Sequence, residues 1–125
     1  MDSLSDPGPK PLLPRIIVTR HAAAMAWALS DFARRGWRCD RAIFHANMED
    51  LCQPADVYGI LPAQMAAAVC QAGGYYHHLA IDVPRTLRGA EMDVRTFLKL
   101  RPRWERFVVV RSGSVRDPIC PRGAH

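Results

Sequence analysis

The chain has 125 residues, with 17 Lys and Arg against 12 Asp and Glu, which gives a net charge of +5 and an isoelectric point near 9.4. This length suits one domain, no apolar run approaches the roughly 20 residues that cross a bilayer, and the acidic N-terminus lacks the basic and apolar regions of a signal peptide. We therefore expect a cytoplasmic protein with no membrane partner. The positive charge favours an anionic partner, although a solvated basic surface would give the same count.

The sequence contains no motif for a metal or a dinucleotide cofactor. It has neither the glycine-rich fingerprint of dinucleotide-binding proteins nor a P-loop, and its acids are not spaced as in a two-metal nuclease. The cysteines are too widely separated for a zinc finger; they are Cys39, Cys52, Cys70 and Cys120. We expect no cofactor and no metal.

The hydrophobic pattern predicts strands that alternate with helices between a flexible leader, residues 1–14, and a flexible tail, residues 112–125. Short apolar or alternating runs predict the strands, and periodic runs predict the helices. The expected strands are 16–18, 42–44, 56–61, 75–82 and 107–110, and the expected helices follow residue 21, span 62–72, and run from near Asp93 to Pro102.

The first helix has a predicted apolar face and a predicted solvent face. Its apolar residues recur at helical spacing, and Gly36 ends it as a helix C′ glycine does. The apolar face is Met25, Ala28, Leu29 and Phe32, and the solvent face is Ser30, Asp31, Arg34 and Arg35.

The second helix has no charged face, because no charged residue occurs between Val57 and Tyr76. A helix that is apolar nearly all round is buried on two sides. We therefore expect a symmetric homodimer in which a second subunit covers this helix. The alternative is that Gln64, Gln71 and the alanines form an uncharged but exposed face.

This alternation predicts the α/β class: a single Rossmann-like domain, residues 15–111, with a mostly parallel sheet flanked by helices. Three polar strand ends should then meet at the carboxyl edge of the sheet, where ligands bind in such folds. They are Thr19-Arg20-His21, Leu61-Pro62 and Asp82-Val83-Pro84.

The residues Thr19, Arg20 and His21 lie where the first strand gives way to the first helix. A hydroxyl, a fixed cation and an imidazole at a helix start suit a phosphate. RNA fits this chemistry, because its own 2′-hydroxyl can attack the adjacent phosphate without metal. The alternative is that Thr19 caps the helix while Arg20 pairs with Asp82 or water and His21 is solvated.

Several of these segments together resemble small CRISPR-associated accessory proteins of type III systems, whose pattern opens with a strand and Val-Thr-Arg-His. The likeness runs from about Ile16 to Val110. It rests on Val18-Thr19-Arg20-His21 with Ala24 and Trp27, Gly59-Ile60-Leu61-Pro62 with Ala66-Ala67 and Cys70, His78-Leu79-Ala80-Ile81-Asp82-Val83-Pro84, and Arg88-Gly89-Ala90-Glu91-Met92.

The resemblance implies a CARF-like fold and a homodimer that binds cyclic tetra-adenylate, not a long nucleic acid. It also implies metal-independent cleavage of that ring by 2′-hydroxyl attack, with catalytic roles for Thr19, Arg20 and His21. The implied ligand-binding residues are Leu61, Pro62, Gln64, His78, Asp82, Arg85 and Arg88.

The chain departs from this family pattern at three positions. A glycine is expected near Ala23, a histidine often stands where Gln64 does, and an acid is expected at Ala68. These departures keep two alternatives open: a protein that binds the messenger without cutting it, and a structural subunit that uses its basic surface on RNA.

Overall fold

The computed structural model describes residues 12–85 and 92–113. The predicted tail from residue 114, nearly all of the predicted leader, and the loop with Arg88 lie outside these residues. The described elements, in chain order, are β1 (Arg15–Val18), α1 (Ala22–Arg35), β2 (Arg41–Ile43), the short 3-10 helix η1 (Met48–Leu51), β3 (Asp56–Gly59), α2 (Ala63–Gln71), β4 (Tyr75–Ala80), α3 (Val94–Leu98) and β5 (Arg103–Phe107).

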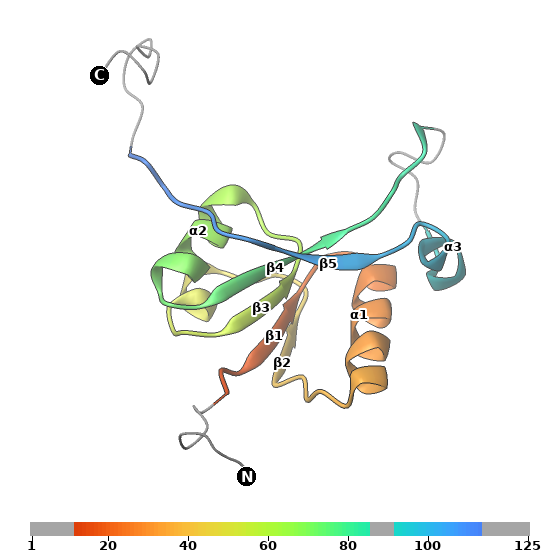
Figure 1. Cartoon of the computed structure of the whole chain (residues 1–125), viewed down its shortest axis with the longest axis horizontal. Helices are drawn as coiled ribbons and strands as arrows, with labels where there is room; N and C mark the ends of the chain where they lie inside the picture. The colour runs from red at the N-terminus through yellow and green to blue at the C-terminus, as the bar shows by residue number, and fades with distance from the viewer. Residues whose placement is uncertain (1–11, 86–91, 114–125) are drawn as a thin grey trace.

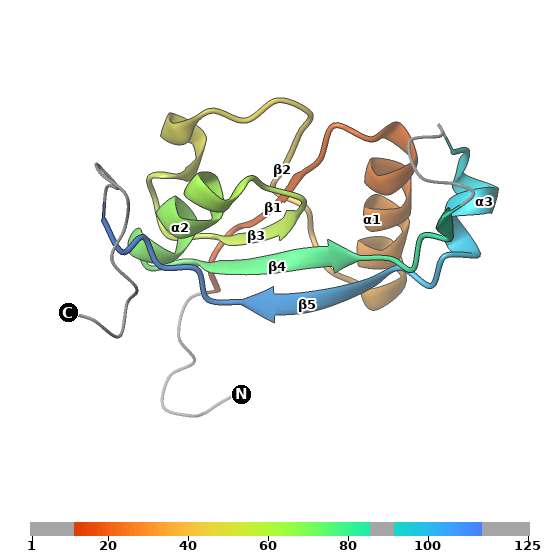
Figure 2. The ribbon, with the colours of Figure 1, turned by 90° about the horizontal axis from the view of Figure 1, so that it is seen from above.

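The strands form one sheet in the order β2-β1-β3-β4-β5. The first four strands are parallel, whereas β5 runs antiparallel to β4 at the edge (Figure 2). This confirms the predicted α/β class with a mostly parallel sheet. Between β1 and β3 the chain changes its direction of travel across the sheet, and such a switch point opens a crevice at the carboxyl ends of the strands.

Helices cover both faces of the sheet (Figure 1). Helix α1 packs over one face together with α3, and helix α2 packs over the other together with η1. Alternate residues of each strand point to opposite faces, so Ile17 joins the α1 core while Ile16 and Val18 join the α2 core. The central strands are therefore buried on both sides, as their apolar composition predicts.

The last strand is the main correction to the predicted elements. It spans Arg103–Phe107, whereas the apolar run predicted 107–110. As an edge strand, β5 needs only one buried face: Trp104 packs against the α1 core, and its neighbours Arg103 and Glu105 remain exposed. Val108 and Val110 lie beyond the ladder and are 79% and 77% exposed.

The predicted solvent face of α1 is wrong at Asp31, which is 2% exposed. Its carboxylate accepts hydrogen bonds from Trp104 Nε1 at 3.0 Å, from Arg35 Nε at 2.7 Å, and from Arg34. Conversely Leu29, predicted in the apolar stripe, is 41% exposed. The sequence pattern misassigned these positions because the burial of Asp31 depends on Trp104, 73 residues further along the chain.

The predicted ends of the helices are confirmed except at the C-terminal end of α3, which ends at Leu98 and not at the predicted Pro102. Gly36 adopts a left-handed conformation at φ 73° and ends α1, and Asp93 caps α3 by accepting from the Thr96 N–H at 2.8 Å. Helix α2 begins directly after Pro62. Its uncharged residues Gln64 and Gln71 are exposed in the single chain, so the face predicted to meet a second subunit is open.

Candidate functional site at the carboxyl edge of the sheet

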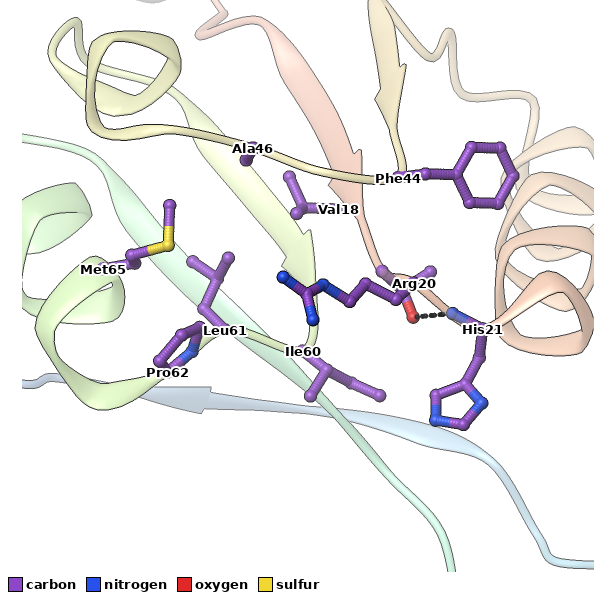
Figure 3. Close-up of a pocket in the computed structure, with 10 residues that line it drawn as sticks. Val18, Arg20, His21, Phe44, Ala46, Ile60, Leu61, Pro62 and Met65 are labelled. Atoms are coloured by element: carbon purple, nitrogen blue, oxygen red, sulfur yellow. Dashed lines mark hydrogen bonds between the residues drawn. The ribbon is translucent and has the colours of Figure 1, made fainter. Parts of the chain in front are cut away.

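A cavity of about 430 Å³ lies at the switch point between β1 and β3. Its walls come from the carboxyl ends of three neighbouring strands and from the first turn of α2 (Figure 3). The lining residues are Val18, Thr19, Arg20, His21, Phe44, Ala46, Ile60, Leu61, Pro62 and Met65. Two of the three predicted strand ends therefore meet here.

Thr19 is held firmly beneath this cavity. It is 2% exposed, its N–H donates to the Ile43 carbonyl at 3.2 Å, and its Oγ1 accepts from the His21 N–H at 3.2 Å (Figure 3). The N-cap of α1 is His21, and no side chain caps the helix. The alternative interpretation of Thr19 as the helix cap is therefore wrong; its hydroxyl fixes the turn that presents Arg20 and His21.

The start of α1 lies beside the cavity, because its N-cap residue, His21, is one of the lining residues. The first bond of the helix runs from the Met25 N–H to the His21 carbonyl at 2.9 Å. The N–H groups of Ala22, Ala23 and Ala24 have no partner within the helix, as in the first turn of any helix. Such a terminus attracts anions through its free donors and its dipole.

Arg20 is the cation of this cavity. Its side chain extends toward Ile60 and Leu61 (Figure 3), and within residues 12–85 and 92–113 no carboxylate pairs with it. Pairing of Arg20 with Asp82, the other alternative, does not occur. Asp82 instead contacts Arg103 at 3.2 Å and Arg101 at 3.8 Å.

Gly59 allows β1 and β3 to end side by side at the cavity. A Cβ at this position would lie 1.8 Å from the Val18 carbonyl oxygen, and its φ of +144° is unfavourable for any residue with a side chain. The close approach also lets the Ile60 N–H donate to that same oxygen at 3.0 Å. Glycine is therefore required for the shape of the cavity floor.

Tyr76 supports the cavity from below, a role that no sequence pattern predicted. Its ring is 3% exposed, and its hydroxyl accepts from the Leu61 N–H at 3.0 Å and lies 2.7 Å from His78 Nδ1. Burial raises the pKa of the Tyr76 hydroxyl, although the Leu61 N–H opposes the shift. The hydroxyl therefore stays protonated near neutral pH and can donate to His78 while it positions Leu61.

The other predicted ligand-binding residues do not line this cavity. Gln64 and Arg85 are exposed, and His78 contacts the Tyr76 hydroxyl and not the cavity. Asp82 contacts Arg103 in β5 and Arg101, which precedes that strand. Arg88 lies outside the described residues. Sequence reasoning missed Phe44, Ala46, Ile60 and Met65, although the strand-end rule applied to 42–44 would have found the first of them.

Two searches of the described part of the chain gave negative findings. No group of three or more His, Cys, Asp or Glu side chains is placed to hold a metal ion. No helix there is long and apolar enough to span a membrane.

Comparison with protein families identifies a relationship that covers most of the chain. Residues 16–110 match the family model described as "Putative CRISPR-associated protein (Cas_VVA1548)". The chain belongs to this family. No curated protein and no solved structure matches it.

The Cas_VVA1548 match confirms the CRISPR-associated part of the resemblance and gives the protein a CRISPR-associated role. The matched segment begins in β1, ends just beyond β5, and includes every residue that lines the cavity. The cavity thus belongs to the family domain itself.

Proposed function

We propose that this CRISPR-associated protein binds cyclic tetra-adenylate at the carboxyl edge of its sheet and cleaves it without metal to linear products. Such cleavage would switch off the antiviral signal that the ring carries. The observation that carries the proposal is the cavity at the β1–β3 switch point, which is lined by Arg20 and by His21, the N-cap of α1.

The phosphate-binding character of the cavity supports a nucleotide ligand. Arg20 supplies a fixed charge and a planar set of N–H donors, and the first turn of α1 supplies backbone donors. Phe44, Ile60 and Met65 supply apolar surface for sugar or base. Sites of this kind combine mostly apolar walls with a few convergent polar groups.

The size of the cavity favours a ligand shared by two subunits. Its volume of about 430 Å³ is in the range of sites for single small ligands, whereas a ring of four nucleotides is larger. A two-fold axis through the ring would let each subunit bind half of it. Gln64, His78, Asp82, Arg85 and Arg88, which the resemblance assigns to the ligand, would then act outside this cavity.

The chemistry we propose uses the ligand's own nucleophile. A ribose 2′-oxygen attacks the neighbouring phosphorus, the bond from phosphorus to the 5′-oxygen breaks, and a 2′,3′-cyclic phosphate remains. The proton of the 2′-hydroxyl leaves, and the departing 5′-oxygen receives one. No metal and no external water is required for this step.

Each residue has a distinct role in this step. Arg20 and the α1 N–H groups stabilise the charge that develops on the phosphoryl oxygens. His21 is the acid or base, because an imidazole ring can both accept and donate a proton. Thr19 acts through the backbone, since its hydroxyl is bonded to the His21 N–H.

The test is multiple-turnover cleavage in the presence of EDTA. The protein is incubated below the concentration of cyclic tetra-adenylate, and the products are separated by liquid chromatography with mass detection. Linear adenylates with cyclic phosphate ends support the proposal. Ring that stays intact and unbound contradicts it.

Two substitutions separate binding from cleavage. Arg20→Ala should weaken binding about tenfold or more, because it removes charge-assisted hydrogen bonds to phosphate. His21→Ala should slow cleavage by about 10²-fold or more while affecting binding less. Arg38→Ala is the matched control, because Arg38 is exposed and pairs with Asp40 away from the cavity. Equal behaviour of all three variants and the parent would place the site elsewhere.

One observation favours a second function, sequestration of the messenger without cleavage. Among the described residues, none hydrogen bonds the His21 ring to orient it as a base, and the position of Gln64 lacks the histidine that the family pattern often has. Intact ring that co-elutes with the protein would identify this function.

A further inference from the structure

A second cavity, of about 450 Å³, lies between helix α1 and strand β5. It shares no lining residue with the cavity at the carboxyl edge. We refer to it as the α1–β5 groove. Its walls contain five aromatic rings, and its rim contains four arginines; the rings are Trp27, Trp37, Tyr58, His77 and Trp104, and the arginines are Arg34, Arg35, Arg103 and Arg106.

The strand register explains why these groups gather. His77 of β4 pairs directly with Arg106 of β5, and Tyr58 of β3 pairs with His77. Residues opposite each other in neighbouring strands point to the same face, so these three side chains share the face that α1 covers. Trp104 lies two residues from Arg106 and joins them.

Aromatic and guanidinium planes are stacked at this groove. The Tyr58 and His77 rings are parallel, with an interplanar angle of 9° and centroids 4.1 Å apart. The Arg35 guanidinium lies 5.0 Å from the Trp37 ring centroid. Bases stack both on aromatic rings and on guanidinium planes. The Tyr58 and His77 rings are buried, so the surfaces that suit a nucleobase are the partly exposed Trp37 and Trp104 rings and the Arg35 guanidinium.

The cations of the rim are not fully used by the fold. Arg34 and Arg35 each bond Asp31 through one nitrogen, and a guanidinium has five N–H donors. Arg106 has no carboxylate partner among the residues that the structure describes, and its guanidinium stacks over Tyr75 at 4.6 Å. Arg103, by contrast, is occupied by Asp82, Glu105 and the Arg101 carbonyl.

His77, in the wall of the groove, is neutral near pH 7. His77 donates to Asp56 across 3.0 Å, and burial lowers the pKa of His77 even though Asp56 opposes the shift. Asp31 is the one carboxylate among the lining residues, and it is satisfied by three donors. Among the lining residues, four arginines accompany one carboxylate, and Arg103 is paired with Asp82 and Glu105.

From this arrangement we infer that the α1–β5 groove is a second binding site, whose ligand is a nucleoside phosphate. The base lies against the tryptophan and guanidinium planes, and the phosphate is held by Arg106 with the free donors of Arg34 and Arg35. Guanidinium groups must hold the phosphate here, because the carbonyl end of α1 repels anions. The same chemistry is offered by a free mononucleotide and by one nucleotide of a single strand.

Tryptophan fluorescence provides a selective test. The chain has three tryptophans, and all of them line this groove, whereas none lines the cavity at the carboxyl edge. The full-length protein is titrated with adenosine monophosphate, adenosine, inorganic phosphate and a linear hexa-adenylate. We expect a saturable, salt-sensitive change with adenosine monophosphate that phosphate alone does not match.

The titrations also distinguish the two sources of the ligand. Saturation by the mononucleotide at a concentration similar to that of the hexamer assigns the site to a free nucleotide. Much tighter binding of the hexamer assigns it to single-stranded RNA. No saturable change with either ligand at millimolar concentration overturns the inference, as does a response to phosphate that equals the response to the mononucleotide.

Three arginine variants locate the binding. Arg106→Ala should weaken binding about tenfold, and Arg106→Lys should recover part of it because the charge returns. Arg20→Ala should leave the titration unchanged, and loss of the signal in that variant would mean that the ligand occupies the carboxyl-edge cavity instead. Thermal melting of each variant separates loss of binding from loss of folding.

Discussion

At the scale of single residues, the Tyr76 hydroxyl connects the floor of the carboxyl-edge cavity to the interior of the sheet. It is the acceptor for the Leu61 N–H and lies within hydrogen-bond distance of His78. Both Tyr76 and Leu61 are buried, whereas Ile60 and Pro62 on either side of Leu61 are exposed. The position of Leu61 therefore depends on one side chain that never touches the ligand space.

Replacement of Tyr76 by Phe should destabilise the protein by about 1–3 kcal/mol, because the buried Leu61 N–H loses its acceptor. Binding of cyclic tetra-adenylate should weaken as well, since the Leu61–Pro62 wall loses its anchor. Denaturant unfolding and ligand titration measure the two effects. Tyr75→Phe is the matched control, because Tyr75 is 47% exposed; equal stability losses in both variants would contradict this role for Tyr76.

His77 should make stability depend on pH. Its folded-state pKa is lowered, first because burial disfavours the charged form. The unfolded chain binds a proton near the ordinary histidine pKa while the folded chain does not, so the free energy of unfolding should decrease as pH falls below about 6.5. Denaturant unfolding is measured between about pH 7.5 and about pH 5, a range that brackets this pKa. The free energy of unfolding should decrease less for His77→Gln than for the parent. An identical decrease in the two proteins would exclude His77 as the source.

At the scale of the elements, Asp31 joins α1 to β5. The carboxylate receives the Trp104 N–H from one element and two arginines from its own helix. Burial acts to raise the pKa of Asp31, but the hydrogen bonds from Trp104 and Arg35 and the charges of Arg35 and Arg34 outweigh it and lower the pKa below the ordinary value. The ionised carboxylate is thus the form that stabilises the fold.

Asp31→Asn should destabilise the protein by about 1–3 kcal/mol, because it removes the charge from a buried set of hydrogen bonds. In the parent protein this stabilisation is present above pH 4 or so and disappears as pH falls through the lowered pKa, and the variant should lack that decrease. Acid titrations followed by circular dichroism provide the measurement. Asp40→Asn, at a more exposed ion pair with Arg38, serves as the control; if it costs as much stability as Asp31→Asn, burial is not what gives Asp31 its effect.

The same elements show what local sequence can and cannot predict. The strands β1 to β4, the glycine that ends α1 and the start of α3 near Asp93 follow from short-range patterns, and the predicted ends of these strands were confirmed within two residues. The place of β5 and the burial of Asp31 depend on contacts between distant segments. A periodicity argument cannot include such contacts, so it failed there.

The residues of the candidate site were likewise predicted where a short-range rule applied and missed where a long-range contact decides. Thr19, Arg20, His21, Leu61 and Pro62 were found because ligands in α/β sheets bind at strand ends, a rule that needs only the order of elements. The support from Tyr76 depends on a hydrogen bond to a loop 15 residues earlier. Nothing in the local pattern around Tyr76 distinguishes it from an ordinary core tyrosine.

At the scale of the whole molecule, a surface with few charges remains open beside α2, and Arg111 is the charged residue among those that line its cavities. Gln64 and Gln71 are exposed there, and the segment after β5 adds Val108 and Val110. Shallow cavities between α2 and this segment are lined by Ala67 and Val110, among others. Apolar surface of this kind supports the homodimer that we propose.

Val110→Asp should convert the dimer to a monomer, because it places a charge in the apolar interface. Light scattering coupled to size-exclusion chromatography measures the mass directly. Val94→Asp is the control, since Val94 is a partly exposed valine at the start of α3. A parent protein that is already monomeric, or a Val110→Asp variant that stays dimeric, would contradict this interface.

The antiparallel direction of β5 has a practical consequence for experiments. Because Phe107 at its end pairs with Tyr76 near the start of β4, residue 107 lies near the edge of the sheet where the parallel strands begin, and so does Arg15. The described chain therefore enters and leaves the sheet on the side away from the carboxyl-edge cavity. A fluorescent reporter attached near Arg15 or Phe107 would therefore lie away from the mouth of that cavity.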